Sequence, residues 1–286
     1  MNSRLALVTG ASSGIGAAIA RVYASHGYDL TVCARREDRL HALADELRLR
    51  HSAETLVIAA DLAAPGAVDA LLSEVRARGR PVDALVNNAG YAIPGGYLAA
   101  GWPAQQALLQ VLVGTVCELT HKLLPEMLER RFGRIVNVAS LAGLAPGQPG
   151  QTLYGPAKAF VVRFSQALHL EVQGTGVHVS ALCPGLTYSE FHDANGSRSA
   201  ISQSTPAWMW LGADEVAQAG YEAAEANRPL CVTGAPNKAL AALGKVIPDE
   251  WGMALIASRL WARAPRRAPD LTVLRAGPGR ARRPPG

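Results

Sequence analysis

Short apolar segments that are typical of β-strands alternate along this chain with segments that have helical periodicity. Several of the apolar segments contain almost no polar residue, as expected for strands that helices cover on both faces. The connections between them are long enough to hold a helix, which a parallel crossover requires. The alternation therefore predicts an α/β fold, with about seven parallel strands in one doubly wound sheet flanked by helices. The strand-like segments are residues 5–9, 29–34, 55–60, 84–87, 134–139, 177–182 and 230–233.

Basic residues are concentrated at the C-terminal end of the chain. Residues 265–286 contain six arginines and one aspartate, so they carry the whole net charge of +5, and residues 1–264 sum to zero. The abundance of Pro, Gly and Arg there predicts a disordered basic tail. Contact with nucleic acid or an acidic membrane surface is the alternative. We expect no nucleic-acid partner, because the tail interleaves no aromatic residues and the rest of the chain has no nucleic-acid-binding motif.

Cysteine, histidine and hydropathy patterns indicate where the protein works. The four cysteines lie far apart with no Cys-x-x-Cys pair, and the seven histidines show no ligand spacing. We therefore expect no metal site and a reducing compartment. Strand-like sequence begins at Leu5, so we expect no signal peptide. No uncharged apolar run reaches about 18 residues, so we expect no transmembrane span and a cytoplasmic location.

A glycine-rich turn follows the first predicted strand. The sequence TGASSGIG places three glycines between residues 9 and 16. Glycine lets the backbone bend and approach a pyrophosphate, whose charge the next helix N-terminus stabilises. The spacing differs from Gly-x-Gly-x-x-Gly, and the turn lacks the lysine of an ATP-binding loop. We expect it to bind a dinucleotide through Gly10, Ser12, Ser13, Gly14, Ile15 and Gly16.

The end of the second predicted strand carries the sequence CARR, in which Arg35 and Arg36 take the place of an acid. An acid here would accept hydrogen bonds from the adenosine ribose and repel a 2′-phosphate, whereas arginine can hold a phosphate through two donors. The pair therefore favours NADP(H) over NAD(H). The alternative is two solvated arginines at a helix start.

Two further strand ends carry candidate cofactor contacts. Asp61 and Leu62 end the third predicted strand, where the carboxylate would meet the adenine amino group. The fourth strand ends in the sequence NNAG, in which Ala89 and Gly90 leave room for the cofactor ribose. The side chains of Asn87 and the asparagine that follows it would tie neighbouring strands or the cofactor together, although paired asparagines also form ordinary turns.

Taken together, the motifs TGASSGIG, DL, NNAG, RIVNVAS, YGPAK and CPGLT resemble those of the short-chain dehydrogenase/reductase family. The resemblance extends from about Leu5 to Thr233 and is specific because the motifs occur in order at family-like spacing. It implies one Rossmann-type NADP-binding domain over residues 1–236, with a substrate loop at about 186–212. It also implies hydride transfer between nicotinamide and a carbonyl or alcohol, in a homodimer or homotetramer built on two long helices.

The pair in YGPAK is the expected catalytic centre. Tyr154 and Lys158 lie four residues apart in a predicted helix and so share one face. A neighbouring ammonium group and the positive nicotinamide ring would lower the tyrosine pKa from about 10. The resemblance implies that Tyr154 transfers the proton, that Lys158 also holds the nicotinamide ribose, and that Ser140 orients the substrate oxygen. It further implies contacts around the nicotinamide amide from Pro184, Gly185, Leu186 and Thr187. A solvated helix pair is the alternative interpretation of Tyr154 and Lys158.

Two departures from the family pattern bear on activity. Leu112 stands where the family usually has an asparagine that holds a proton-relay water. Ser140 and Tyr154 are fourteen residues apart, where thirteen is usual, and a Gly/Pro-rich loop can absorb the extra residue. Leu112 keeps open the alternative of an NADP(H)-binding protein with little turnover and a regulatory or scaffold role. A methyltransferase on a similar sheet is a third reading, which would leave NNAG and the Tyr-x-x-x-Lys pair without a role.

The residues expected to face the substrate are mostly apolar and include no cluster of Arg or Lys. A hydrophobic ketone or secondary alcohol is therefore the natural substrate hypothesis. Residues 237–264 are predicted to form an apolar helical extension that covers the site or packs on another subunit, with anchoring at a membrane interface as the alternative. The candidate substrate residues are Ile93, Leu141, Leu144, Leu153, Leu186, Tyr188, Phe191, Trp208 and Trp210.

Overall fold

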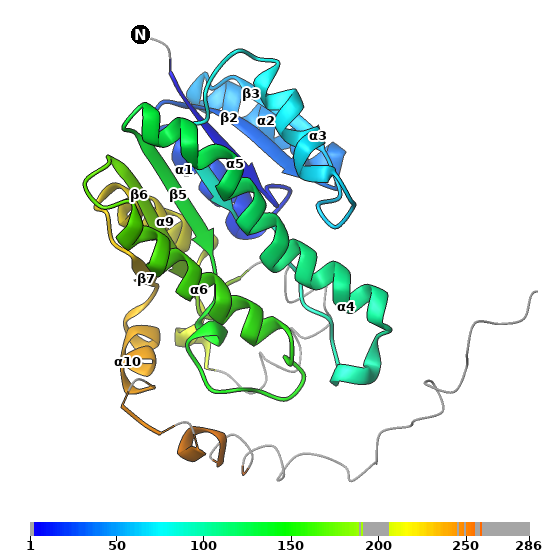
Figure 1. Ribbon diagram of the computed structural model, residues 1–286, viewed down its shortest axis with the longest axis vertical. Coiled ribbons are helices and arrows are strands. Elements are labelled where there is room, and N and C mark those ends of the chain that lie inside the picture. The colour runs from blue at the N-terminus through cyan, green and yellow to red at the C-terminus, as the bar shows by residue number, and fades with distance from the viewer. Residues whose placement is uncertain are drawn as a thin grey trace, which may run out of the picture.

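The computed structural model describes residues 3–188, 190, 206–244, 246–248, 250–254 and 258. Seven parallel strands form one sheet in the order β3-β2-β1-β4-β5-β6-β7 (Figure 1). The predicted α/β fold with a doubly wound parallel sheet is confirmed. The strands are β1 (Arg4–Thr9), β2 (Tyr28–Ala34), β3 (Thr55–Ala59), β4 (Ala84–Asn87), β5 (Gly133–Val138), β6 (Val177–Cys183) and β7 (Leu230–Val232).

Helices cover both faces of the sheet. The helices packed on one face are α1 (Gly14–Ser25), α2 (Glu37–His51) and α9 (Ala213–Glu225). Those packed on the other face are α3 (Ala67–Arg76), α5 (Thr115–Glu129) and α6 (Tyr154–Glu171). Alternate strand residues supply the two apolar layers, because successive side chains of a strand point to opposite faces. Val8 and Val86 are buried in the first layer, and Leu7 and Leu85 in the second.

The strand order reverses direction at β1, which places a crevice beside it. From β1 the chain runs outward through β2 and β3, then returns to the other side of β1 with β4 and continues to β7. The helices that follow β1 and β4 therefore pack on opposite faces of the sheet. Doubly wound proteins bind their ligands in the crevice that this divergence opens at the carboxyl ends of the strands.

One long helical segment runs diagonally across the molecule, in front of the sheet in Figure 1. It joins α4 (Trp102–Leu109), a π-helical turn η2 (Gln110–Gly114) and α5. Among the described residues it is the one helix long and apolar enough to cross a membrane, and 44% of its most apolar window is buried inside the fold. Leu108 and Leu119 are almost wholly buried against the rest of the domain, so we describe it as a core helix.

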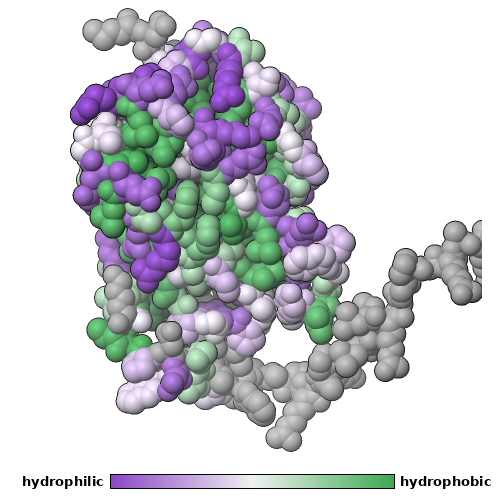
Figure 2. All heavy atoms as spheres, viewed as in Figure 1, coloured by the Kyte–Doolittle hydropathy of each residue, from purple (hydrophilic) through white to green (hydrophobic). Residues whose placement is uncertain are grey.

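Helix α10 (Ala235–Leu243) begins two residues before the predicted C-terminal extension. Its Leu240 and Leu243, and Trp251 beyond it, are exposed. Apolar side chains also gather on the face that α5 and α6 present in Figure 2. Phe160 and Leu170 of α6 are exposed. The predicted residue Phe191, the rest of the predicted substrate loop between 191 and 205, and the predicted tail at 265–286 lie outside the described residues.

Candidate active site

The glycine-rich turn forms the floor of the crevice between β1 and β4. Gly10 has a φ of +67°, in the left-handed region that favours glycine. A Cβ on Gly16 would lie 2.3 Å from the carbonyl oxygen of Gly10 and 2.4 Å from Nδ2 of Asn88, so no larger residue fits there. Asn88 Nδ2 donates to the carbonyl oxygens of Thr9 and Gly10 at 3.0 and 3.1 Å. The turn is therefore held from the end of β4 by Asn88, the second asparagine of the NNAG sequence.

Arg36 connects the start of α2 to the glycine-rich turn. Its Nη2 donates to Ser13 Oγ at 2.8 Å and to Ser12 Oγ at 3.0 Å. Its Nε donates to Ser12 Oγ at 3.2 Å. Arg35 precedes it and is exposed. The structure thus brings the predicted residues Ser12, Ser13 and Arg36 together at one end of the crevice, where a cationic group beside hydroxyl groups can bind a phosphate.

An acid and a third arginine join this cluster. Arg36 Nη1 donates to Glu190 Oε2 at 2.8 Å, and Arg39 donates to the other oxygen of the same carboxylate. The hydrogen bonds from Arg39 and Arg36 lower the pKa of Glu190 to about 2. Arg39 is three residues after Arg36, so helical periodicity could have found it. Glu190 is 154 residues from Arg36 and follows no local pattern.

The end of β3 carries the predicted adenine contacts. Asp61 is exposed, and its Oδ1 accepts a hydrogen bond from the amide of Ala63 at 3.0 Å. Leu62 is buried, and its carbonyl oxygen accepts from Thr115 Oγ1 at 3.1 Å. The backbone around Asp61 is therefore fixed from α5, while the carboxylate remains accessible at the rim of the crevice. Its contact with adenine stays a prediction.

Asn87 takes part in a buried network inside the domain. Its Nδ2 donates to Asn137 Oδ1 on β5 at 2.8 Å and to Thr120 Oγ1 on α5 at 3.3 Å. Asn137 Nδ2 in turn donates to Ser165 Oγ on α6 at 2.9 Å. Asn87 Oδ1 has no hydrogen-bond partner among the described residues. The network shows Asn87 tying strands and helices together, as the sequence suggested, and a direct contact with the cofactor stays a prediction.

Ser140, Tyr154 and Lys158 meet at the other end of the crevice. Ser140 follows β5 and caps the short helix η3 (Leu141–Gly143), where its Oγ accepts from the amide of Ala142 at 3.1 Å. Tyr154 begins α6, and its side chain is hydrogen-bonded to that of Ser140. Lys158 Nζ lies 5.8 Å from the centroid of the Tyr154 ring. The extra residue between Ser140 and Tyr154 does not separate the two side chains.

The electrostatics of this trio differ from the sequence-based expectation. Burial raises the pKa of Tyr154 to about 12, and the hydrogen bond with Ser140 acts in the opposite direction. Burial lowers the pKa of Lys158 to about 8. Lys158 Nζ donates to the carbonyl oxygen of Val138 at 2.7 Å. The predicted fall in the tyrosine pKa is thus absent from the protein alone, because burial disfavours both charged forms; a positively charged nicotinamide ring would act to lower it.

The CPGLT segment approaches the trio from β6. The carbonyl oxygen of Pro184 accepts from the amide of Leu141, at 2.8 Å. A Cβ on Gly185 would lie 2.2 Å from Nδ2 of Asn237, a buried residue of α10. Thr187 is buried and bridges to Leu211. The segment is therefore fixed on both sides, and Asn237, which sequence reasoning missed, packs against it from a helix 52 residues further along.

Leu186 and the predicted aromatic substrate residues continue from this segment. The carbonyl oxygen of Leu186 accepts from the amide of Leu211 at 2.9 Å. Tyr188 stacks on Trp210 with the ring centroids 5.0 Å apart. Tyr188 and Trp208 are exposed, whereas Trp210 is buried. These side chains lie on the described borders of the predicted substrate loop.

Leu112 lies against the end of the NNAG segment, near Lys158. It is completely buried in the π-helical turn η2. A Cβ on Gly90 would lie 2.9 Å from Leu112 Cδ2 and 3.7 Å from Lys158 Nζ. Gly90 therefore leaves the room that Leu112 fills. A hydrocarbon side chain occupies this place beside the ammonium group, in agreement with the departure noted in the sequence.

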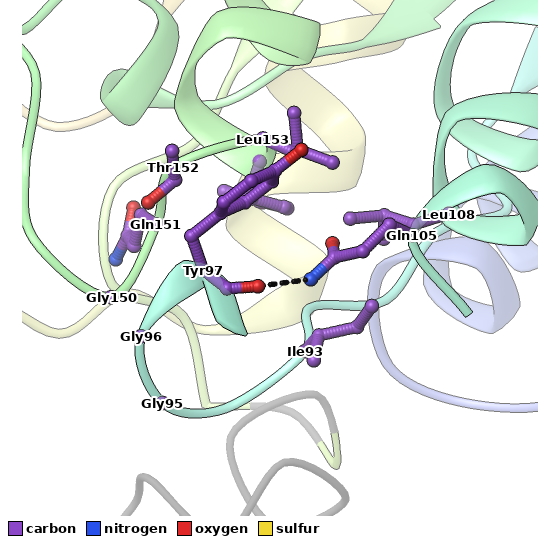
Figure 3. A pocket seen from close by; sticks show the side chains of 11 residues that line it. Ile93, Gly95, Gly96, Tyr97, Gln105, Leu108, Gly150, Gln151, Thr152 and Leu153 are labelled. Atoms are coloured by element: carbon purple, nitrogen blue, oxygen red, sulfur yellow. Dashed lines mark hydrogen bonds between the residues drawn. The ribbon is translucent and has the colours of Figure 1, made fainter. Parts of the chain in front are cut away.

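A pocket opens beside Tyr154 (Figure 3). The cavity is small, with a volume of about 20 Å³, and it widens into open solvent. Gln105 is buried in its wall and donates from Nε2 to the carbonyl oxygen of Tyr97 at 2.9 Å. No Lys or Arg is among the described residues that line it. The lining residues are Ile93, Gly95, Gly96, Tyr97, Gln105, Leu108, Gly150, Gln151, Thr152, Leu153 and Tyr154.

Two of the predicted substrate residues, Ile93 and Leu153, line this pocket. The polar side chains of Gln105, Gln151 and Thr152 line it as well. Gln151 Oε1 is buried and has no hydrogen-bond partner among the described residues. The wall is thus less uniformly apolar than the sequence suggested. Among the described residues, no group of His, Cys, Asp and Glu side chains is placed to hold a metal ion.

A parallel sheet with a glycine-rich crevice and a Ser–Tyr–Lys trio defines a nicotinamide-dependent oxidoreductase of the Rossmann type. The sequence profile described as short chain dehydrogenase matches residues 4–199. The chain belongs to this family, the short-chain dehydrogenases/reductases, and is an oxidoreductase acting on CH–OH and C=O groups. The family predicted from the motifs is confirmed.

Three similar proteins illustrate the range of the family. Sulfoacetaldehyde reductase 2 from Chromohalobacter salexigens is 36% identical over 230 residues, which cover 76% of this chain and 86% of that protein. A short-chain dehydrogenase from Sphingobium yanoikuyae, solved with NADPH, is 30% identical with a TM-score of 0.73, covering 93% and 99% of the two chains. A family member from Burkholderia phymatum, solved with NAD, is 27% identical with a TM-score of 0.75, covering 85% and 92%. The family therefore includes users of either nicotinamide cofactor.

Proposed function

We propose that this protein transfers hydride between NADP(H) and the carbonyl or secondary alcohol group of a small, largely apolar substrate. The observation that carries the proposal is the layout of the crevice. Arg36 with two serine hydroxyls stands at one end, and the trio of Ser140, Tyr154 and Lys158 stands at the other. Along the sheet, Arg36 follows β2, the glycine-rich turn follows the neighbouring strand β1, and Ser140 follows β5 on the far side of β4.

The residues present fit a dinucleotide. Side chains at Gly10 and Gly16 would collide with the backbone of Ala89 or Gly10 and with Asn88, so glycine lets the turn pack closely against the end of β4. Bare amides at a helix N-terminus bind a pyrophosphate. When bound there, the cofactor supplies the hydride, and the protein supplies position and electrostatic field.

Each member of the trio has a separate task. The raised pKa keeps the Tyr154 phenol protonated, so it can give its proton to a carbonyl oxygen that becomes an alkoxide. Ser140 donates a hydrogen bond to the same oxygen and stabilises the developing charge. Lys158 lies one helical turn after Tyr154, and its ammonium group donates to the carbonyl oxygen of Val138. Its positive charge favours the tyrosinate that Tyr154 becomes when it gives up its proton.

Phenylalanine in place of Tyr154 tests this assignment. We expect Tyr154→Phe to lower kcat by at least about 100-fold, in line with the usual contribution of a general acid. Binding of NADPH should stay within a factor of about two, since the ring and its packing are retained. Loss of less than about tenfold in kcat would contradict the role of Tyr154.

The choice of NADP(H) rests on Arg35 and Arg36. The two solved relatives hold NADPH and NAD respectively, so the preference here is argued from the chain's own residues. We expect nicotinamide fluorescence titrations to show tighter binding of NADPH than of NADH. The double change of Arg35 and Arg36 to alanine should abolish the difference. Arg48→Ala, on the last turn of the same helix and paired only with Asp45 among the described contacts, is the matched control.

The substrate class follows from the pocket beside Tyr154. The curated relative described above is named for sulfoacetaldehyde, a small anion, but no described lining residue of this pocket is cationic. An anion would enter without a charge partner, which is costly in a low-dielectric site. We expect an alicyclic ketone to be reduced with a higher kcat/KM than sulfoacetaldehyde, and the opposite ranking would contradict this assignment.

Leu112 supports a second candidate, an NADP(H)-binding protein with little turnover. A hydrocarbon beside Lys158 cannot hold a water molecule that returns protons to the site. The two candidates differ in a simple measurement. Steady turnover of any ketone over many cycles supports the enzyme, whereas binding of NADPH with at most one turnover supports the second candidate.

The assembly and location remain part of the proposal. We propose a homodimer or homotetramer formed through the face of α5 and α6, where a groove holds Cys117, Leu124, Phe164 and Leu168. Sedimentation of the purified protein tests the assembly. We propose that the protein works in the cytoplasm, which localisation of a tagged chain would test.

A further inference from the structure

Glu190 joins the end of the crevice that holds Arg36 to the segment that follows β6. Its two carboxylate oxygens bind two different arginines, with Oε2 accepting from Arg36 at 2.8 Å and Oε1 accepting from Arg39. Both arginines lie at the start of α2, whereas Glu190 follows the CPGLT segment of β6. One carboxylate therefore connects two parts of the chain that lie more than 150 residues apart.

The donors of Arg36 are divided among three acceptors. Nε binds Ser12, Nη2 binds Ser12 and Ser13, and Nη1 binds Glu190. A guanidinium holds a phosphate best through two parallel donors, and a carboxylate uses the same donors. The space between Arg36 and Arg39 is thus shaped for one oxyanion, and Glu190 fills it.

We propose that Glu190 is a specificity-determining residue for the cofactor, because its carboxylate and the 2′-phosphate of NADP(H) compete for Arg36 and Arg39. The inference rests on the proposed function and adds Arg39 and Glu190 to the residues that set cofactor choice. NAD(H) has a hydroxyl in place of that phosphate, so it binds without displacing the carboxylate. Glu190 therefore narrows the preference for NADP(H) that the arginines alone would give.

The backbone before Glu190 is anchored near the catalytic end. The amide of Tyr188 donates to the carbonyl oxygen of Leu211 at 2.9 Å, and its ring stacks on Trp210. Thr187 is buried and bridges to the same Leu211. The carboxylate of Glu190 therefore reaches the arginines from a backbone that is held in place two residues earlier, at Tyr188.

Glutamine in place of Glu190 separates charge from shape. We expect Glu190→Gln to tighten NADPH about tenfold, the effect of removing an intramolecular competitor held by two partly exposed ion pairs. Adenosine 2′,5′-bisphosphate should tighten by the same factor, and NADH should change by less than about twofold. The matched control is Glu37→Gln, which removes an equal charge from the same helix start. Glu37 pairs with His41 and contacts neither arginine through its side chain among the described interactions.

Three outcomes overturn the inference: NADPH binding that is unchanged in Glu190→Gln, binding that weakens, or an equal gain in Glu37→Gln. Weaker binding would mean that Glu190 closes over the bound phosphate rather than competing with it. Failure of the proposed function would give a different result, because the wild-type protein would then bind neither NADPH nor NADH. A wild type that prefers NADH but switches to NADPH in Glu190→Gln would contradict the proposed preference and support the competition. Glu190→Ala should reproduce the gain.

Discussion

Alanine in place of Gly16 tests the crevice floor, because helix propensity and the contacts predict opposite signs. Gly16 lies inside α1, where replacing glycine with alanine normally stabilises a helix by about 1 kcal/mol. Here the new Cβ would lie 2.3 Å from the Gly10 carbonyl oxygen and 2.4 Å from Asn88 Nδ2. The first neighbour is backbone, so the turn itself must move.

The expected magnitude follows from three effects. Overpacking of this kind costs about 1–3 kcal/mol. Displacing Asn88 weakens its bonds to Thr9 and Gly10, each worth about 1 kcal/mol. The gain in helix propensity offsets about 1 kcal/mol. We therefore expect a net destabilisation of about 2 kcal/mol, or a fall in Tm of about 4–8 °C for a domain of this size.

Thermal unfolding followed by circular dichroism measures this effect. Gly155→Ala is the matched control, because Gly155 is also helical and its Cβ would meet only the Ala142 carbonyl oxygen, at 3.6 Å. We expect the control to be neutral or slightly stabilising. An unchanged or raised Tm for Gly16→Ala would refute the argument that close contact, rather than helix propensity, selects glycine there.

Three further predictions concern the crevice and the trio. Lys158 has its pKa lowered to about 8 in the fold, below the ordinary value of 10.5; the unfolded chain therefore binds more protons between these two pH values, and the free energy of unfolding should rise with pH there. Lys158→Met should remove that rise, which urea titrations from pH 7.5 to 10.5 would detect. Leu112→Asn should lower Tm, because it buries a polar group at a site packed with hydrocarbon, and should raise kcat if proton supply limits turnover; an unchanged Tm would contradict the packing. Asn88→Ala removes two hydrogen bonds to the turn, so we expect about 1–3 kcal/mol of destabilisation in urea and weaker NADPH binding; unchanged binding would show that the turn holds itself.

Local patterns in the sequence were enough to predict the sheet and much of the crevice. The five central strands are almost wholly buried and leave continuous apolar runs, which is why they could be placed. The edge strands β3 and β7 are mostly half-buried, but they are also short apolar segments between helical ones. The glycine-rich turn could be predicted because the need for glycine is local. Tyr154 and Lys158 could be paired because a helix brings residues four apart together.

The features that the sequence did not reveal depend on contacts between distant segments. Neighbouring asparagines point to opposite sides of an extended chain, yet nothing local shows that Asn88 rather than Asn87 faces the turn. Glu190 contacts Arg36 and Arg39 only because the segment that follows β6 comes close to the start of α2 in the folded protein. The direction of the tyrosine pKa was also wrong for the protein alone, because charge pairing is visible in a sequence and desolvation is not.

The buried network of Asn87, Asn137 and Ser165 has a consequence for how the active site can change over evolutionary time. Ser165 lies three helical turns after Tyr154 on nearly the same side of α6. Its Oγ accepts from Asn137 at 2.9 Å and donates to the Val161 carbonyl oxygen at 2.7 Å, so the rotational setting of the helix is fixed from the sheet. The pocket walls come largely from segments outside this network. Those walls can therefore change to admit other substrates while the orientation of the Tyr154 side chain stays the same.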